Sequence, residues 1–310
     1  MILTVTMNPS VDISYRLNQL MLNNVNRAEE YEKTPGGKGL NVTRIIKQMQ
    51  KPVLATGLVG GANGTFITEE LLKDRIKHDF TFTNKNTRNC IAILHDGNQT
   101  EVLERGPFIE KSVQNDFLDK FSELVKYAEV VVISGSVPNG VETNFYRTLL
   151  EEAEENQKVI VDASGELLQS VIRSEKKPFA IKPNESEICE LLHVEVEEFE
   201  INAKDIVLNN VLLKEIPLIL ISRGSKGAYV KYYDDFYEVN IPTVSVVNPV
   251  GSGDATVAGI SVSLLENKSI EEVMKCSMSL GILNAMEKKT GYVNLKEYEN
   301  IYSSVKVVKL

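Results

Sequence analysis

The chain has 310 residues, of which 43% are hydrophobic and 25% charged, which is ordinary for a folded globular protein. This length fits one large α/β domain, alone or with a small appendage, or two domains. The net charge of −9 argues against a nucleic-acid-binding or membrane-surface protein, although a few clustered cations could still hold an anionic substrate.

Three cysteines, Cys90, Cys189 and Cys276, lie far apart and form no metal-binding spacing or disulfide framework. The first residues, MILTVTMNPS, carry no basic flank and soon become polar, which is not typical of a signal peptide. No apolar run approaches the roughly 18 residues that a membrane-spanning helix needs. We therefore expect a cytoplasmic protein with reduced thiols and with neither a membrane nor a nucleic acid as partner.

Short apolar runs alternate with helical patterns along most of the chain. Runs such as VVVIS and LILIS do not alternate with polar residues, which indicates strands buried on both faces, as in a parallel sheet. The expected strands are 2–6, 53–59, 130–134, 159–162, 179–182 and 218–222, and the expected helices are 39–49, 64–74, 114–127, 142–156, 185–192, 203–210, 254–266 and 270–287. This order predicts an α/β fold with a right-handed, doubly wound, mostly parallel sheet. A hairpin in YVKYYDDFYEV, turning at Asp234-Asp235, is expected at the edge of this sheet.

Two segments interrupt the alternation. Residues 88–106 have the pattern of a hairpin that turns at Asp96-Gly97. Both faces of its first strand, RNCIAIL, carry apolar side chains, whereas a hairpin lying wholly on a core would expose one polar face. We expect this hairpin and residues of about 11–34 to form a small β-sheet lid, covered on one side by substrate or by a partner chain.

Polar residues or glycines follow nearly every expected strand. In open α/β sheets, ligands bind beyond the carboxyl ends of the strands, so these residues would line one cleft. Any one of them, taken singly, is more simply explained as an ordinary loop residue. They are Asn8, Asp12, Gly60, Gly61, Gly135, Ser136, Asp162, Lys182, Asn184, Glu187, Arg223 and Gly224.

The stretch NPVGSGDATVAGI, residues 248–260, places a glycine-rich loop and an acid at the start of a buried helix. As a helix N-cap alone, Asp254 would contribute about 1 kcal/mol and would not need the glycines. Gly251 and Gly253 around Ser252 let successive N–H groups converge at a helix N-terminus and bind anionic oxygen. A carboxylate beside such an anion hole suits phosphoryl transfer, because the acid can accept an alcohol's proton.

The stretch TPGGKGLNVTRI, residues 34–45, is a second glycine-rich loop before a helix, with Lys38 and Asn41 on the first turn. Backbone N–H groups and Asn41 could hold sugar hydroxyls and Lys38 a phosphate; the alternative is a helix start with a solvent-exposed lysine. The chain has no G-x-x-x-x-G-K-[ST] P-loop, and no G-x-G-x-x-G follows the first strand. A kinase of the P-loop or protein-kinase type and a Rossmann dehydrogenase are therefore disfavoured.

Together, GGKGLNVT and NPVGSGDATVAGIS resemble the two signature motifs of the PfkB (ribokinase-like) carbohydrate kinases. The resemblance extends over the whole chain and includes LTVTMNPSVD, TRNC, ISGSVPNG, DASGE, KPNESE, SRGSKGA and GYVNL. It implies one ribokinase-like domain over residues 1–310, with a three-layer α/β/α architecture, a β-sheet lid, and ATP and Mg²⁺ as cofactors. Within the family, the chain looks like the hexose-phosphate kinases, and most like tagatose-6-phosphate kinase.

The resemblance also implies roles for individual residues. Asp254 is the base that takes the proton from the sugar's primary hydroxyl, beside the anion hole formed by residues 251–253. The residues implied to bind the sugar phosphate are Asp12, Gly37, Lys38, Asn41 and Arg88, with Arg27 from the lid, and Lys38 and Arg88 hold its phosphate. The residues implied to contact ATP are Lys182, Ser222, Gly224, Gly227 and, bordering the adenine, Asn284. Asn184 and Glu187 are implied to organise Mg²⁺ through its waters; alone, they indicate a helix cap followed by an exposed glutamate.

The expected reaction is ATP-dependent phosphorylation of the C1 hydroxyl of D-tagatose 6-phosphate, giving tagatose 1,6-bisphosphate. One alternative is 1-phosphofructokinase activity, because fructose 1-phosphate also carries a phosphate at one end and a free primary hydroxyl at the other. An alternative of another class is a non-catalytic nucleotide-binding regulator on the same fold. The apolar outer face of the lid predicts a homodimer through the lid sheets.

Overall fold

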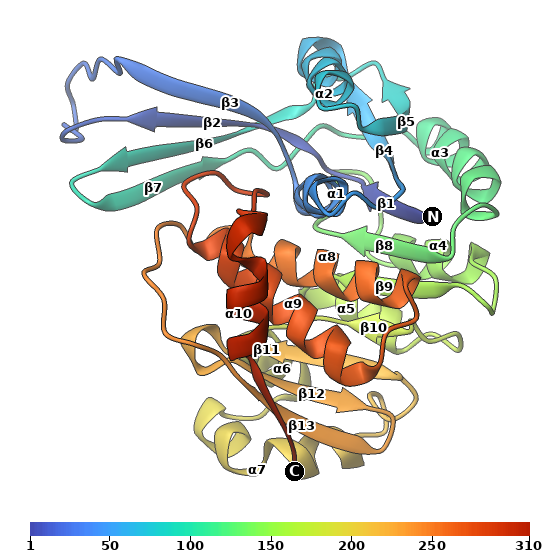
Figure 1. Cartoon of the computed structure of the whole chain (residues 1–310). Helices are drawn as coiled ribbons and strands as arrows, with labels where there is room; N and C mark the ends of the chain where they lie inside the picture. The colour runs from blue at the N-terminus through green and yellow to red at the C-terminus, as the bar shows by residue number, and fades with distance from the viewer.

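A ten-stranded, mostly parallel sheet forms the centre of the protein, in a computed structural model that describes all 310 residues (Figure 1). In spatial order its strands are β14 (Lys306–Lys309), β13 (Asp235–Asn240), β12 (Ala228–Tyr232), β11 (Leu218–Ser222), β10 (Ala180–Ile181), β9 (Lys158–Asp162), β8 (Val130–Ser134), β1 (Ile2–Thr6), β4 (Val53–Gly60) and β5 (Lys77–Thr83). The strands from β11 to β5 are parallel, and β12, β13 and β14 add an antiparallel edge. The predicted doubly wound α/β sheet is confirmed.

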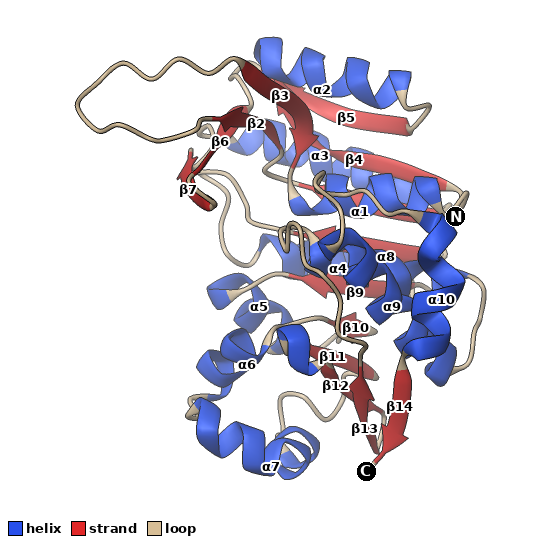
Figure 2. Cartoon of the chain, turned by 60° about the vertical axis from the view of Figure 1, so that its left-hand side comes forward, coloured by secondary structure: helices blue, strands red, loops and turns tan.

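Helices cover both faces of this sheet and give three layers (Figure 2). On one face lie α1 (Lys38–Gln48), α8 (Ser252–Leu265), α9 (Ile270–Ala285) and α10 (Tyr298–Ser304). On the other lie α3 (Lys111–Val125), α4 (Phe145–Glu152), α5 (Gly165–Ile172), α6 (Glu185–Leu192) and α7 (Val196–Asn209). The helix α2 (Gly61–Lys73) packs on β4 and β5, and single 3-10 turns occur at Gly224–Lys226 and Leu295–Glu297. None of the helices combines the length and apolarity that crossing a bilayer requires.

The helix α8 is buried along almost its whole length because α1, α9 and the sheet all pack on it. Its sequence is accordingly apolar or small on every side, with no polar stripe. At Gly259 a Cβ atom would lie 2.4 Å from the Cα of Ser277 on α9, so only glycine permits this close helix crossing. The N-terminus of α8 is therefore held on a rigid support.

A separate four-stranded sheet projects from the carboxyl ends of the parallel strands and forms the predicted lid (Figure 1). Its strands, in spatial order, are β3 (Glu30–Gly36), β2 (Ser10–Arg16), β6 (Arg88–His95) and β7 (Asn98–Leu103). The hairpin turns at Asp96 and Gly97 as predicted, with φ of 48° and 73°, a left-handed pair typical of tight two-residue turns. The segments 11–34 and 88–106 thus form one sheet, joined by parallel pairing of β2 with β6.

Four elements were not predicted from the sequence: β5, β14, α5 and α10. The strand β5, KHDFTFT, is a polar edge strand that lacks the continuous apolar run of the central strands. The turn between β12 and β13 lies at Tyr233-Asp234, one residue before the predicted Asp234-Asp235, because Tyr232 pairs with Asp235 and Tyr233 takes the left-handed conformation. The predicted helix 142–156 is shorter and is observed as α4.

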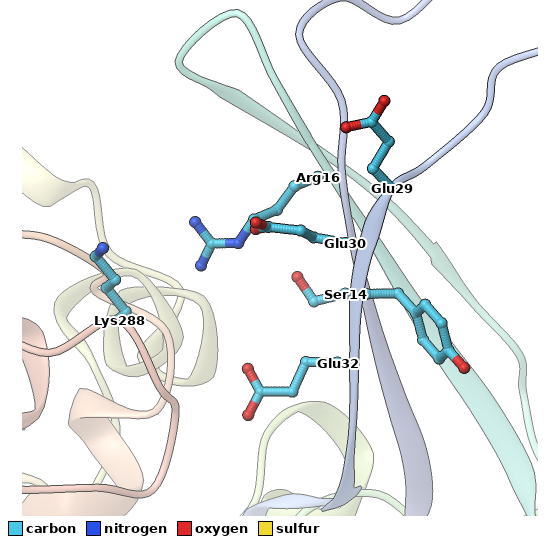
Figure 3. A pocket seen from close by; sticks show the side chains of 7 residues that line it. Ser14, Arg16, Glu29, Glu30, Glu32 and Lys288 are labelled. Carbon is cyan, nitrogen blue, oxygen red and sulfur yellow. The ribbon is translucent and has the colours of Figure 1, made fainter.

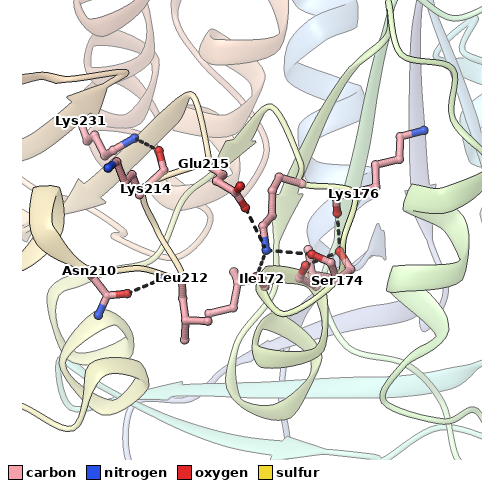
Figure 4. Close-up of polar contacts among 10 residues, drawn as sticks. Ile172, Ser174, Lys176, Asn210, Leu212, Lys214, Glu215 and Lys231 are labelled. Carbon is pink, nitrogen blue, oxygen red and sulfur yellow. Dashed lines mark hydrogen bonds and ion pairs between the residues drawn. The ribbon is translucent and has the colours of Figure 1, made fainter.

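One buried lysine ties the edge of the sheet to the loop before β11 (Figure 4). Lys231 on β12 is 1% exposed, and its ammonium group donates to the carbonyl oxygens of Ile216 at 2.7 Å and Lys214 at 3.2 Å. We expect Lys231→Ala to lower the free energy of unfolding by about 1–3 kcal/mol, because both carbonyl groups lose their donor. Urea denaturation measures this change. The exposed Lys214→Ala serves as the control, expected within about 0.5 kcal/mol of wild type; equal midpoints for both variants would contradict the assignment.

Candidate active site

The first turn of α8 carries a buried acid next to a left-handed glycine. Gly251 has a φ of +84°, and a Cβ atom there would lie 2.5 Å from the side chain of Thr290, so glycine is required. The Ser252 hydroxyl is buried and has no hydrogen-bond partner. Asp254 is 5% exposed, and its Oδ2 accepts a 2.7 Å hydrogen bond from the amide of Asn41 on α1. The acid, the glycine-rich loop and Asn41 therefore lie together at the N-terminus of α8.

The surroundings of Asp254 raise its pKa to about 7. Burial is the largest cause, and the negative charge of Asp162 adds to it. The hydrogen bond from Asn41 and the ammonium groups of Lys38 and Lys182 act in the opposite direction and lower the pKa. A carboxyl group whose pKa lies near neutrality can hold and release a proton at physiological pH, which is what a general base requires.

Asp162, the last residue of β9, lies between two lysines. Its carboxylate is 3.4 Å from the Lys38 ammonium and 3.5 Å from the Lys182 ammonium, and it is 1% exposed. Burial disfavours its charge, but the two ammonium groups outweigh burial and hold the pKa of this carboxyl below its usual range. Asp162 also raises the pKa of Lys38. The Lys38 side chain remains 41% exposed, so the ammonium group is accessible to a ligand.

Asp12 and Arg88 lie at the base of the lid, where it joins the sheet. The Asp12 carboxylate accepts a 2.6 Å hydrogen bond from Ser10, and burial raises its pKa. A Cβ atom on Gly36 would lie 2.0 Å from that carboxylate, so the glycine lets β3 pass close to Asp12. Arg88 donates to the backbone oxygens of Asn8, at 3.1 and 3.2 Å, and Glu104, at 2.8 Å. Arg88 is half-buried, and the register of β2 and β6 places it on the same face of the lid sheet as Asp12.

The two other residues predicted to bind the sugar phosphate, Gly37 and Arg27, lie in different parts of the structure. Gly37 precedes α1 with a φ of +107° and packs against Thr6, so the α1 N-terminus is close to the end of β1. Arg27 is exposed and belongs to the loop of residues 17–29, which lies at the outer end of the lid (Figure 2); it forms no hydrogen bond or ion pair with the other predicted site residues. The structure brings Asp12, Gly37 and Asn41 together, and it leaves Arg27 outside this group.

The predicted nucleotide-site residues follow β10 and β11. Lys182 comes directly after β10 and is 5% exposed, and Ser222 ends β11, where it bridges to Asn184. Gly224 has a φ of +55°, and a Cβ atom on Gly227 would lie 1.9 Å from the carbonyl oxygen of Val239 on β13. These glycines therefore allow a tight turn beside the neighbouring strand.

Asn184 and Glu187 form a capping box at the start of α6. The Asn184 side chain accepts a 2.8 Å hydrogen bond from the Glu187 N–H, and the Glu187 carboxylate accepts one of 2.8 Å from the Asn184 N–H. One oxygen of Glu187 remains available for another partner. No group of three or more His, Cys, Asp or Glu side chains is placed to hold a metal ion by itself.

Asn284 lies on α9 in the interior of the protein, where it is 0% exposed. Its amide donates to the carbonyl oxygen of Val250 at 2.9 Å, and its oxygen accepts from the Gly291 N–H at 3.0 Å. Asn284 therefore fixes the loop before α8 relative to the loop after α9.

Two cavities flank the loop that follows α9. One, of about 370 Å³, is lined by Val247, Met286, Glu287, Lys288, Lys289 and Tyr292. The other, of about 600 Å³, lies between the lid and the same loop, and Figure 3 shows Arg16, Ser14 and Glu32 of the lid pointing toward Lys288. The larger cavity, between the lid and the loop after α9, is lined mostly by polar side chains.

The sequence model of the pfkB family carbohydrate kinases matches residues 5–296. The chain belongs to the pfkB family of carbohydrate kinases. The phosphofructokinase-2 of Escherichia coli, crystallised with potassium, is 25% identical, with a TM-score of 0.89 over 97% of this chain and 98% of that one. A Thermotoga maritima protein described as a possible 1-phosphofructokinase is 25% identical, with a TM-score of 0.87 over 100% and 99%. A Staphylococcus aureus protein provisionally described as a phosphofructokinase is 29% identical, with a TM-score of 0.85 over 100% and 99%.

Two residues of this pfkB-family kinase, Arg44 and Gln48, were not predicted from the sequence as site residues. Asp162, at the end of a parallel strand, was expected to line the cleft but was given no role. Arg44 and Gln48 lie on α1 and contact the loop after α9, more than 240 residues later in the chain. No local pattern announces contacts of such long sequence separation.

Proposed function

We propose that the protein transfers the γ-phosphoryl group of ATP to the primary hydroxyl of a ketohexose phosphate. The observation that carries this proposal is the buried Asp254 at the α8 N-terminus, with a pKa of about 7, bonded to Asn41 and facing two lysines. In this reaction Asp254 accepts the proton of the attacking hydroxyl. The N–H groups of residues 251–253 and the unpartnered Ser252 hydroxyl stabilise negative charge on the transferred phosphoryl group.

The lysine pair at Asp162 supplies positive charge at the same place. Lys182 faces the nucleotide phosphates, as its position after β10 favours. The family resemblance implies that Lys38 holds the distal phosphate of the sugar, but the pairing of Lys38 with Asp162 favours a role beside the transferred phosphoryl group. Arg88, at the lid base, then holds the distal phosphate, for which a bidentate guanidinium group is suited.

The donor set fits Mg²⁺ held mainly by ATP phosphates and water, because Mg²⁺ usually retains waters and takes only one or two protein carboxylates. Glu187, which keeps one oxygen free, and Asn184 would contact the waters of the ion. Bound there, Mg²⁺ would neutralise phosphate charge during transfer. Ser222, Gly224 and Gly227 are proposed to contact the phosphates and ribose of ATP.

We propose D-tagatose 6-phosphate as the sugar, phosphorylated at the C1 hydroxyl to tagatose 1,6-bisphosphate, because the sequence motifs resemble tagatose-6-phosphate kinase most. Fructose 1-phosphate is a comparably supported alternative, since the Thermotoga maritima relative is described as a possible 1-phosphofructokinase. Fructose 6-phosphate belongs in the same comparison, because the Escherichia coli phosphofructokinase-2 was crystallised with it. Lys38 and Arg88 would serve all three sugars.

The test is ADP release from Mg·ATP with the three sugar phosphates measured in parallel. We expect the highest kcat/KM with tagatose 6-phosphate. A higher value with fructose 1-phosphate or fructose 6-phosphate would keep the mechanism and replace the substrate. Absence of turnover with all three sugar phosphates would favour the non-catalytic nucleotide-binding regulator. The buried Asp254 argues against this alternative, because a protein that only senses a nucleotide needs no catalytic base.

We propose that two copies associate through the outer faces of their lids. On this face, exposed or half-buried apolar side chains from four strands lie in register: Tyr15, Tyr31, Ile91, Ile93 and Val102. Tyr31 is 64% and Val102 55% exposed, which is unusual for such a contiguous set on a monomer. Light scattering at micromolar concentration should give the mass of a dimer, about twice 34.6 kDa; the mass of a monomer would contradict the proposal.

A further inference from the structure

Arg44 on α1 is a buried cation to which the mechanism above assigns no task. Its side chain is 6% exposed, and no carboxylate lies within ion-pair distance of it. Instead, its guanidinium group donates to the carbonyl oxygens of Pro35 and, at 3.2 Å, Thr290, and to the side-chain oxygen of Asn41 at 2.5 Å. A buried charge without an ion pair is costly, so such a group calls for a specific reason.

The contact with Asn41 supplies that reason. An asparagine amide has a donor end and an acceptor end, and its orientation follows from its hydrogen-bond partners. A guanidinium group can only donate, so the Asn41 oxygen must face Arg44. The Asn41 NH₂ group is then directed at Asp254, to which it donates at 2.7 Å. Rotation of the amide by half a turn would instead place an oxygen against the carboxylate.

The other contacts of Arg44 join two separate parts of the structure, the lid and the loop after α9. Pro35 lies at the base of lid strand β3, and Thr290 lies on the loop after α9. The next residue, Gly291, has a φ of +68°, and a Cβ atom there would lie 2.8 Å from the Arg44 guanidinium group. Gly291 donates to Asn284, which in turn bonds the loop before α8. Arg44 is therefore part of a hydrogen-bonded ring that starts and ends at the N-terminus of α8.

We propose that Arg44 is a positioning residue, which fixes the Asn41 amide with its NH₂ group toward the Asp254 carboxylate and so keeps the base ready to accept a proton. This inference rests on the proposed function for the role of Asp254 as base. The charged groups that face Asp254 are Asp162 at the end of β9, Lys182 after β10, and Lys38 and Arg44 on α1.

The effect of losing Arg44 has a defined sign. The Asn41 hydrogen bond and the nearby positive charge favour the ionised form of Asp254, so their loss raises its pKa further above the wild-type value of about 7. More of the base is then protonated at a given pH. Activity should fall most at low pH and recover in part at high pH.

The experiment compares Arg44→Lys with Gln48→Ala. Gln48 bonds the backbone oxygen of Gly291 at 3.0 Å and the N–H of Val293 at 3.0 Å, so its loss loosens the same loop without touching Asn41. Arg44→Lys retains a positive charge but lacks the planar fork that reaches all three acceptors. The readouts are the ¹³C titration of the Asp254 carboxyl carbon, assigned by its disappearance in Asp254→Asn, and kcat/KM at pH 6.5 and 8.5.

We expect the Asp254 titration of Arg44→Lys to move to higher pH, and its loss of kcat/KM to be about 3–10-fold larger at pH 6.5 than at pH 8.5. Gln48→Ala should leave the titration unchanged and lose activity equally at both pH values. An unshifted titration in Arg44→Lys, or an equal shift in Gln48→Ala, would overturn the proposal. Arg44 would then only stabilise the contact of α1 with the lid and with the loop after α9. A wild-type protein without turnover on any sugar phosphate would overturn the proposed function instead, while the titration would still decide the role of Arg44.

Discussion

Asp254→Asn is expected to lower kcat by roughly 10²–10⁴-fold and to leave the KM values for sugar phosphate and ATP nearly unchanged. Asparagine keeps the size and shape of the side chain but cannot accept the proton of the attacking hydroxyl. It also removes a buried acid whose ionisation burial disfavours, so the folded state should not be weakened. Steady-state kinetics with varied sugar phosphate and ATP measure the change.

Circular dichroism and thermal unfolding of Asp254→Asn provide the control for folding. If the variant is folded and still turns over at close to the wild-type rate, Asp254 is not the base. If KM rises strongly while kcat is retained, the carboxylate binds the sugar instead of activating it.

Lys38→Met is expected to lower kcat by about 10²–10³-fold, with the KM for the sugar phosphate changed less than about 3-fold. The reason is its place beside Asp162 and Lys182, where its charge would stabilise the transferred phosphoryl group only during transfer. Methionine keeps most of the aliphatic stem and removes the charge. The measurement is the separation of kcat from KM in steady-state kinetics.

Arg88→Met is the matched comparison for Lys38→Met, because it removes a cation from the lid base and leaves Lys38, Lys182 and Asp162 unchanged. We expect its KM for the sugar phosphate to rise about 10–100-fold, with kcat within a few-fold of wild type. If the two variants exchange these patterns, so that Lys38→Met raises KM and Arg88→Met lowers kcat, Lys38 holds the distal phosphate as the sequence analysis assigned.

The strands and turns that could be predicted from the sequence are those that a single local pattern specifies. The central strands β8 and β11 are continuous apolar runs because both of their faces are buried. The edge strands β5 and β14 lack this pattern because one side meets solvent, and they exist through pairing with a neighbour. The lid hairpin was predictable because Asp96-Gly97 specifies a tight turn locally.

The candidate site was predictable in its motifs but not in its contacts. Asp254 and Asn41 each stand in a glycine-rich loop-to-helix stretch, but their hydrogen bond joins residues 213 positions apart. The same holds for Asp162, whose two lysine partners lie at the start of α1 and in the loop after β10. Asn284 was assigned to the adenine by resemblance alone, and no local pattern indicates that packing of α9 against α8 buries it.

The most direct test of the central claim is ³¹P NMR of a mixture of the wild-type protein, Mg·ATP and tagatose 6-phosphate. We predict that ATP signals decrease in step with the appearance of ADP and of one new phosphomonoester signal coupled to the C1 methylene protons of the sugar. The same mixture with Asp254→Asn should show this conversion slowed by at least about 10²-fold. ATP that remains unchanged, or that yields ADP and inorganic phosphate without a new sugar phosphate, would contradict the claim that this site transfers a phosphoryl group to that sugar.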